Sequence, residues 1–344
     1  MAFSRSPGSP SAAHVLFALF LVYITWGSSY IGYKLSIEVA GPFLVAAGRC
    51  GTGGVLLCLL LMLTGRWTRA SCATNAWIGV LGIPMVLVAS GFVGLGLEQV
   101  SSAVGAVLNG STPIIMIIAG FLFAHEPRPA PRQCVGLVTG SCAIAWLGIM
   151  QEGASGDHPI IGAGIILLAV CGWVVGSLLM RHRPIREDIS PLQVSAIMLT
   201  LGGLECLVLG LLLGEHHDLR WENLRPGIVF AFSWMTIGGS LVAYSVYMWL
   251  LANVPLSVAI SYEYVVPVVG IFLGWFVAGE PVGLGTLVAS AVTVGSVALI
   301  IVPGRQGARG NHRGVYAHWR LAWKMHDRLA RERRERRRRD QGGA

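Results

Sequence analysis

Lysine is almost absent from this sequence, and charged residues of any kind are scarce. The 344 residues include two lysines, Lys34 and Lys324, and Asp, Glu, Lys and Arg together make up 12%. Neither lysine follows a glycine, so there is no P-loop through which ATP could be hydrolysed. His125-Glu126 is not followed by a second histidine at the spacing of a zinc protease, and the seven cysteines show no paired CxxC spacing. We therefore expect neither an enzyme nor a bound metal or other cofactor.

Apolar residues take the place of charge. They make up 54% of the sequence, and the mean hydropathy is +0.66, far outside the usage of soluble domains. A helix needs roughly 20 apolar residues to cross the hydrocarbon core of a membrane. Ten apolar stretches approach or exceed that length, near residues 14–35, 42–64, 76–97, 101–123, 132–150, 160–181, 190–213, 227–250, 255–278 and 283–302. The predicted fold class is all-α integral membrane, with ten transmembrane helices.

Charge is concentrated in the C-terminal tail and on one side of the predicted membrane. Thirteen of the 25 Lys and Arg residues and four of the 17 Asp and Glu residues follow Val302, so the tail carries +9 and the rest of the chain −1. The short loops on the side of the termini are also the more basic ones. Because such loops stay in the cytoplasm, we predict a protein of the cell membrane with both termini cytoplasmic. A polybasic tail after a span is typical of binding to anionic lipid, and no nucleic acid partner is expected.

Residues 100–127 and 254–281 are two copies of one segment. A shift of 154 without a gap superposes eight identical residues, namely Val100, Val104, Pro113, Ile117, Gly120, Ala124, Glu126 and Pro127 on Val254, Val258, Pro267, Ile271, Gly274, Ala278, Glu280 and Pro281. Each copy is an apolar run with a proline in its middle and Glu-Pro at its end. Two related halves of a membrane protein favour a binding site where they meet.

An odd number of helices in each half inverts the second half. We expect a cytoplasmic N-terminus at 1–13, a first repeat at 14–150, an external linker at 151–159, a second repeat at 160–302 and a cytoplasmic Arg-rich tail at 303–344. Five helices bring the chain to the opposite side, so the second repeat enters the membrane upside down relative to the first. Such 5+5 inverted-topology repeats can expose one site to either side by rocking.

Several motifs in order along the chain resemble one known family. They are Trp26-Gly27-Ser28-Ser29-Tyr30, the spacing from Pro42 to Arg49, the run from Pro113 to Glu126-Pro127, and the run from Tyr264 to Glu280-Pro281. In these motifs the chain resembles the EamA-type permeases of the drug/metabolite transporter superfamily, over residues 14–302. The resemblance implies a secondary transporter, usually an exporter of amino acids, related metabolites or drugs. It also implies a central cavity lined mainly by helices 1, 3, 4, 6, 8 and 9, with helices 5 and 10 peripheral.

Three ionisable residues, Arg49, Glu205 and Glu263, lie well inside predicted spans. A charge at that depth costs at least about 2.5–3.5 kcal/mol, so each should face protein or water. Glu263 either holds a substrate amine or takes a proton during transport, or else is a structural partner of Arg49. Arg49 either binds a substrate carboxylate or ties its helix to a neighbour. Its place in the second half is taken by Met198, so any role of Arg49 is one-sided. Glu205 is expected to be structural.

The repeat makes Asn109 the counterpart of Glu263. Each lies four residues before its repeat's proline, Pro113 or Pro267, which frees a backbone carbonyl one turn earlier and predicts a hinge or helix break. Asn109 either contacts substrate or satisfies a freed backbone group. Six aromatic residues complete the predicted substrate site, although aromatic residues in spans also serve for packing: Trp26, Tyr30, Trp173, Tyr244, Tyr247 and Tyr262.

The combined patterns predict a secondary active transporter that exports amino acids or related small metabolites by alternating access. Without an ATP site, transport would use a proton or substrate gradient. Alternatives are a drug or lipid-metabolite exporter, an importer, or a non-transporting membrane scaffold that acts through its basic tail. Deleting residues 305–344 separates these, because a transporter keeps most of its flux and a scaffold loses its activity. Glu126 and Glu280, at membrane boundaries, are expected to accept hydrogen bonds from the next helix.

Overall fold

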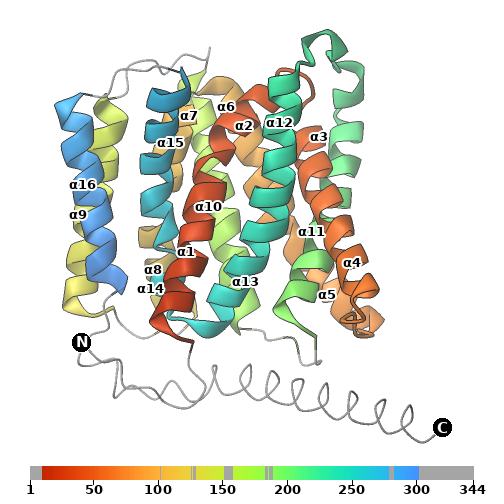
Figure 1. Cartoon of the computed structure of the whole chain (residues 1–344), viewed down its shortest axis with the longest axis horizontal. Helices are drawn as coiled ribbons and strands as arrows, with labels where there is room; N and C mark the ends of the chain where they lie inside the picture. Colours follow the sequence, from red (N-terminus) through yellow and green to blue (C-terminus); the bar gives the residue numbers. More distant parts are fainter. Residues whose placement is uncertain are drawn as a thin grey trace, which may run out of the picture.

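The protein is helical throughout the part of the chain that the structure describes. The computed structural model describes residues 10–100, 102–124, 126, 129–150, 158–182, 185, 189–278 and 283–301, and contains no β-strand in these ranges (Figure 1). The first half contains α1 (Ala12–Gly27), α2 (Ser29–Ser36), α3 (Pro42–Ala46), η1 (Ala47–Gly51), α4 (Thr52–Leu63), α5 (Cys72–Gly82), η2 (Ile83–Gly91), α6 (Phe92–Gln99), α7 (Ser102–Asn109), α8 (Thr112–Phe123) and α9 (Pro131–Met150). The second contains α10 (Pro159–His182), α11 (Pro191–Leu212), η3 (Glu215–His217), η4 (Trp221–Asn223), α12 (Pro226–Trp234), η5 (Met235–Ala243), α13 (Tyr244–Asn253), α14 (Leu256–Ala259), α15 (Tyr262–Ala278) and α16 (Leu284–Ile301).

Proline and serine set where many of these helices begin. The helices α3, α9, α10, α11 and α12 have proline as their first residue, where its missing N–H costs nothing and its fixed φ suits the helix. Ser11, Ser71 and Ser190 precede α1, α5 and α11, and each accepts a hydrogen bond from a backbone N–H of the first turn. Each predicted apolar stretch coincides with helix, within about four residues at either end, and these local signals mark where several of the helices start.

The apolar helices are suited to a membrane. Six helical stretches within the described residues are long and apolar enough to cross one: Ala12–Ser36, Pro42–Leu63, Cys72–Gln99, Pro159–His182, Pro191–Leu212 and Pro226–Asn253. Shorter apolar helices occupy Val107–Phe123, Leu256–Gly270 and Leu284–Ile300. Large apolar side chains such as Phe17, Phe20 and Leu63 are 62%, 56% and 86% exposed on the outer surface. A water-soluble protein rarely presents apolar surface on this scale, so the surface fits a lipid environment.

The first helices of the two halves run in opposite directions. Residues just after α2 bond to the segment that leads into α12, through Arg220 N–H to Val39 O and the Arg225–Glu38 ion pair. Arg181, at the end of α10, instead bonds to Leu251 O at the end of α13. Since α12, η5 and α13 form one continuous stretch across the bundle, α2 and α10 end at opposite faces.

The α9–α16 pair and two π-helical segments indicate which helices lie at the edge of the bundle and which at its centre. The α9–α16 pair stands at the left edge in Figure 1, as the family resemblance implied for helices 5 and 10. The third helix of each half widens into a π-helical segment, η2 or η5, on the way through the bundle. Such segments leave irregularly bonded carbonyls and are frequent at functional sites. The sequence patterns predicted ordinary helix there.

Candidate functional site

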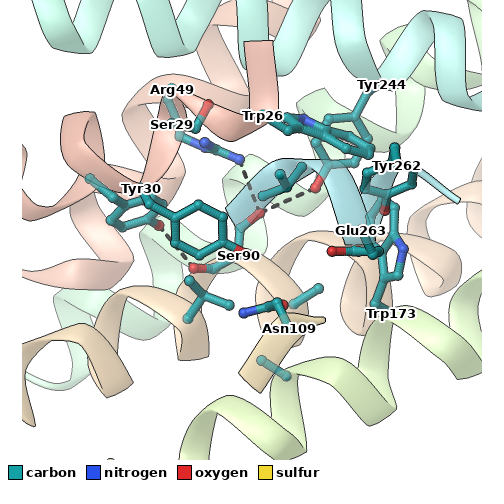
Figure 2. Close-up of a pocket in the computed structure, with 15 residues that line it drawn as sticks. Trp26, Ser29, Tyr30, Arg49, Ser90, Asn109, Trp173, Tyr244, Tyr262 and Glu263 are labelled. Carbon is teal, nitrogen blue, oxygen red and sulfur yellow. Dashed lines mark hydrogen bonds between the residues drawn. The ribbon is translucent and has the colours of Figure 1, made fainter. Parts of the chain in front are cut away.

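A central cavity lies where the two halves meet. The volume that the centre of a water-sized sphere can occupy in it is about 100 Å³. On the same measure a single water molecule needs roughly 10–15 Å³, so the cavity is several times larger. Figure 2 shows its lining, to which every helix that the resemblance implied contributes, together with Arg49 from the second helix. The lining residues are Trp26, Ser29, Tyr30, Tyr33, Arg49, Ala89, Ser90, Val93, Asn109, Ala169, Trp173, Tyr244, Tyr262, Glu263 and Val266.

Repeat-related residues face one another in this cavity. The ring centres of Trp26 and Trp173, which hold similar places in the two halves, lie 5.3 Å apart. Ser90 and Tyr244 are related by the shift of 154, and their hydroxyl oxygens lie 3.2 Å apart. Asn109 and Glu263, related by the same shift, both line the cavity. The axis that relates the two halves therefore passes through or beside the cavity.

Arg49 reaches the cavity from the π-helical segment η1. It is 5% exposed. Its Nη2 donates to Ser90 Oγ at 3.4 Å, and its guanidinium carbon lies 5.2 Å from the centre of the Tyr33 ring. Among the described residues its buried Nε has no hydrogen-bond partner and no carboxylate forms an ion pair with it. The guanidinium can therefore still bind an anionic group.

Ser90 organises the polar side of the cavity around Arg49. Its carbonyl accepts from Tyr33 Oη at 2.9 Å, and Tyr244 Oη donates to Met85 O at 2.9 Å. Because a buried guanidinium is stabilised by a fixed array of polar groups, this network holds Arg49 in place. The sequence patterns pointed to Tyr244 but not to Ser90, Ser29 or Tyr33. Ser90 could have been found, since the shift of 154 joins it to Tyr244.

Glu263 and Asn109 line another part of the same cavity. Glu263 is 6% exposed and forms no ion pair with any residue that the structure describes. The structural pair with Arg49 is therefore not formed in this structure. Asn109 is 9% exposed, and its Nδ2 donates to Gly105 O at 3.0 Å. The amide nitrogen satisfies a helix carbonyl, which leaves the amide oxygen for a donor in the cavity.

Five of the six predicted aromatic residues, all except Tyr30, form one cluster, and all except Tyr247 line the cavity. The Trp26 ring centre lies 5.3–5.5 Å from those of Trp173, Tyr244 and Tyr247, and 4.7 Å from that of Tyr262. Trp26 is fixed by a 2.8 Å bond from its Nε1 to Gly239 O in η5. Tyr30 lines the cavity from α2.

Tyr247 differs from the prediction, because it does not line the cavity. It is fully buried, and its hydroxyl lies 2.9 Å from Ser177 Oγ. It follows Tyr244 by three residues, so its ring lies nearly one turn further along α13, packed against Trp26, Trp173 and Tyr262. It therefore packs behind three lining residues rather than among them.

Comparison with known proteins shows which family this chain belongs to. The model of the EamA-like transporter family matches residues 14–149 and again 160–302. The chain belongs to the EamA-like transporter family. It is a membrane transporter of the drug/metabolite type.

Individual relatives of this EamA protein agree with that family. The chain is 28% identical over 285 residues to the uncharacterized inner membrane transporter YedA of Escherichia coli, covering 82% of this chain and 89% of YedA. It is 26% identical over 314 residues to a WAT1-related chloroplastic protein of Arabidopsis thaliana, covering 87% of this chain and 73% of that protein. A solved crystal structure at 16% identity superposes with a TM-score of 0.67 over 85% of this chain and 97% of its own, which shows the same fold.

The helix breaks of this EamA protein lie before the two predicted prolines. In the first copy, α7 ends at Asn109 and α8 starts at Thr112, so Pro113 is its second residue. In the second copy the break lies between α14 and α15, and Pro267 is inside α15, which continues through it. The prediction of a break at Pro267 itself needs this correction. The proline lies early in α15, where the carbonyl it frees, that of Glu263, is still close to the cavity.

Two other acidic residues lie away from the cavity. Glu205 faces Gly82 between α11 and α5, and its buried Oε2 has no partner among the described residues. Glu126 does not cap α9 as expected, but accepts hydrogen bonds from Arg181 and His182 at the end of α10. Glu280 and the Arg-rich tail lie outside the described residues.

Proposed function

We propose that this chain is a secondary active transporter of the cell membrane that exports amino acids or related small metabolites by alternating access. Its ten spans form 5+5 inverted repeats over residues 14–150 and 160–302, with both termini in the cytoplasm. The observation that carries the proposal is the buried cavity at the meeting of the two halves, which holds Arg49 and Glu263 without an opposite charge from the described residues for either one.

The charges of the cavity suit a zwitterion. Burying an ion without a partner costs several kcal/mol, so each of these side chains is poised to gain from a ligand of opposite charge. In the proposed complex, Glu263 and the amide oxygen of Asn109 receive the ammonium group, and Arg49 binds the carboxylate. The rings of Trp26, Trp173 and Tyr262 contact the apolar part of the substrate.

A proton gives Glu263 a second role in the cycle. When the site is empty, a proton can neutralise the carboxylate in place of the substrate ammonium group. Substrate and proton would then occupy Glu263 in turn, which couples export to the proton gradient. No ATP is needed, consistent with the absence of a P-loop from the sequence.

Exchange in liposomes tests this function. The full chain is reconstituted into vesicles loaded with a mixture of unlabelled amino acids, and uptake of each labelled amino acid is followed. Glu263→Gln should lower exchange of the transported compound at least tenfold, since charge-assisted hydrogen bonds are worth about 1.5–3 kcal/mol. Asn109→Ala should lower it less. Glu205→Gln, the same change inside a span but outside the cavity, is the matched control. Exchange unchanged by both cavity variants would contradict the proposed site.

A further inference from the structure

A partly buried charge cluster lies at the end of the bundle where α10 and α13 finish. Arg181, in the last turn of α10, is 5% exposed. Its Nε donates to Glu126 Oε1 and its Nη1 to Leu251 O at 2.9 Å, while His182 Nε2 lies 3.1 Å from the same carboxylate oxygen. The other cross-half ion pair that the described residues form, Arg225–Glu38, is 59% and 41% exposed on its two side chains.

This cluster joins the two halves of the protein. Glu126 follows α8 of the first half, whereas Arg181, His182 and Leu251 belong to the second. Leu251 lies in the last turn of α13, where unpaired helix carbonyls carry partial negative charge. Arg181 therefore fastens the ends of α8, α10 and α13 together. Partial burial acts to raise the pKa of Glu126, but the hydrogen bond from His182 and the charge of Arg181 outweigh it and hold that pKa below its ordinary 4.5.

The cluster and the cavity lie on opposite sides of a packed layer of side chains. Along α10, Ala169 and Trp173 line the cavity, Ser177 comes one turn later and Arg181 one turn after that. Ser177 is fully buried and bonded to Tyr247, so a layer of packed side chains separates the cavity from Arg181. None of the lining residues on α10 lies beyond Trp173 toward Arg181.

At the opposite end of the bundle, Lys34 is the counterpart of Arg181, but it has different bonding partners. The spacing of 147 that relates Trp26 to Trp173 also relates Lys34 to Arg181. Their carbonyl acceptors, Leu97 O at 2.6 Å and Leu251 O at 2.9 Å, are related by the shift of 154. Lys34 is thus fastened to a helix of its own half, and among the described residues no carboxylate pairs with it. Arg181 has the additional bond across the halves.

We propose that Glu126, Arg181 and His182 form a latch that holds this end of the transporter closed and opens when the site turns toward it. Glu126 and Arg181 are its positioning residues, which set the access of the cavity without touching substrate. With the predicted orientation, the latched end faces the cytoplasm. The inference rests on alternating access in the proposed function, but it predicts an accessibility that can be measured without knowing the substrate.

Thiol labelling measures that accessibility. Ser177→Cys is introduced into the full chain with the seven native cysteines replaced, and a small membrane-impermeant methanethiosulfonate is applied to either side of oriented vesicles. We expect slow labelling from both sides in the parent. Glu126→Gln and Arg181→Gln should each raise the rate at which the introduced thiol is labelled about tenfold, and only from the latched end. A change of this size is expected because charged residues in contact are energetically coupled. The double variant should label no faster than the faster single variant, because both changes break one interaction.

The Glu38→Gln variant supplies the matched control, since it breaks the exposed Arg225 pair at the opposite end by the same chemical change. It should leave the labelling rate at the parental value. If Arg181→Gln fails to fold, His182→Gln removes one contact to Glu126 and should give a smaller rise. Labelling unchanged in folded Glu126→Gln overturns the latch, as does an equal rise in Glu38→Gln. Flux that is insensitive to Glu263→Gln, with labelling still raised by Glu126→Gln, would reject the substrate site and keep the latch.

Discussion

Two buried or partly buried glutamates of this bundle, Glu263 and Glu205, have different surroundings. Glu263 and Glu205 are both glutamates within apolar helices, and neither has an ion-pair partner among the described residues. Glu263 lines a cavity that a ligand or water can enter, so its charge can be compensated from outside the protein. Glu205 lies beside Gly82 of the neighbouring helix α5 and does not line the cavity. The surroundings, and not the residue type, make Glu263 the functional candidate.

Glu205→Met should therefore stabilise the protein without reducing transport. A buried polar atom without a partner costs about 1–3 kcal/mol, and an apolar side chain of similar length removes that cost. We expect the unfolding midpoint in detergent to rise by a few degrees and exchange in liposomes to stay at the parental level. A lower midpoint would mean that Glu205 has a partner it needs, and lost exchange would place it in the transport cycle.

Site residues could be predicted from the sequence where the repeat relates them. The shift of 154 pairs Asn109 with Glu263 by position in the chain, and both line the cavity. Applied to Tyr244, the same shift points to Ser90, which the sequence patterns did not single out. Tyr247 was assigned to the cavity because aromatic identity alone does not show which way a ring points. The pair between Glu126 and Arg181 was also missed, since a contact between residues 55 positions apart leaves no local pattern.

At the scale of the element, the helices were predictable and their irregularities were not. Apolar length, with proline or serine at the start, is enough to locate a helix in a membrane. The π-helical segments η1, η2 and η5 carry Arg49, Ser90 and the carbonyl that fixes Trp26. They differ from ordinary α-helix only in their local backbone hydrogen bonds, so no hydrophobic periodicity predicts them. The breaks between α7 and α8 and between α14 and α15 could be placed near a proline but not at the right residue.

Close packing between η1 and α11 holds Arg49 at the cavity. A Cβ on Gly203 would lie 2.5 Å from both Cα and N of Gly51, two residues after Arg49. Gly203→Ala should therefore push the helices apart, at a cost of about 1–3 kcal/mol, and lower exchange by displacing Arg49. Gly164→Ala is the control, since nothing lies within 4 Å of its added Cβ, and it should stabilise α10 slightly. Equal melting temperatures for the two variants would contradict this packing argument.

At the scale of the whole molecule, two related halves enclose one site but treat its two ends differently. The cavity lies where Trp26 meets Trp173 and Ser90 meets Tyr244. Arg49 has no counterpart in the second half, where Met198 stands. The halves are joined at one end by the Arg181–Glu126 pair, whose side chains are 4% and 15% exposed, and at the other by the far more exposed Arg225–Glu38 pair. The general fold and family followed from hydropathy, the repeat and a few motifs. The asymmetry that would give transport a direction depends on individual side chains in contact, which only the folded chain brings together.

Comparison of secreted metabolites tests the central claim most directly. Bacterial cells that over-produce the full chain are compared by untargeted mass spectrometry of the medium with cells that produce Glu263→Gln or Glu205→Gln at equal membrane levels, and with empty cells. The account predicts a small zwitterionic compound that accumulates outside with the parent and with Glu205→Gln, but not with Glu263→Gln. Equal accumulation of such a compound from the parent and from Glu263→Gln would contradict the claim that Glu263 forms the transport site.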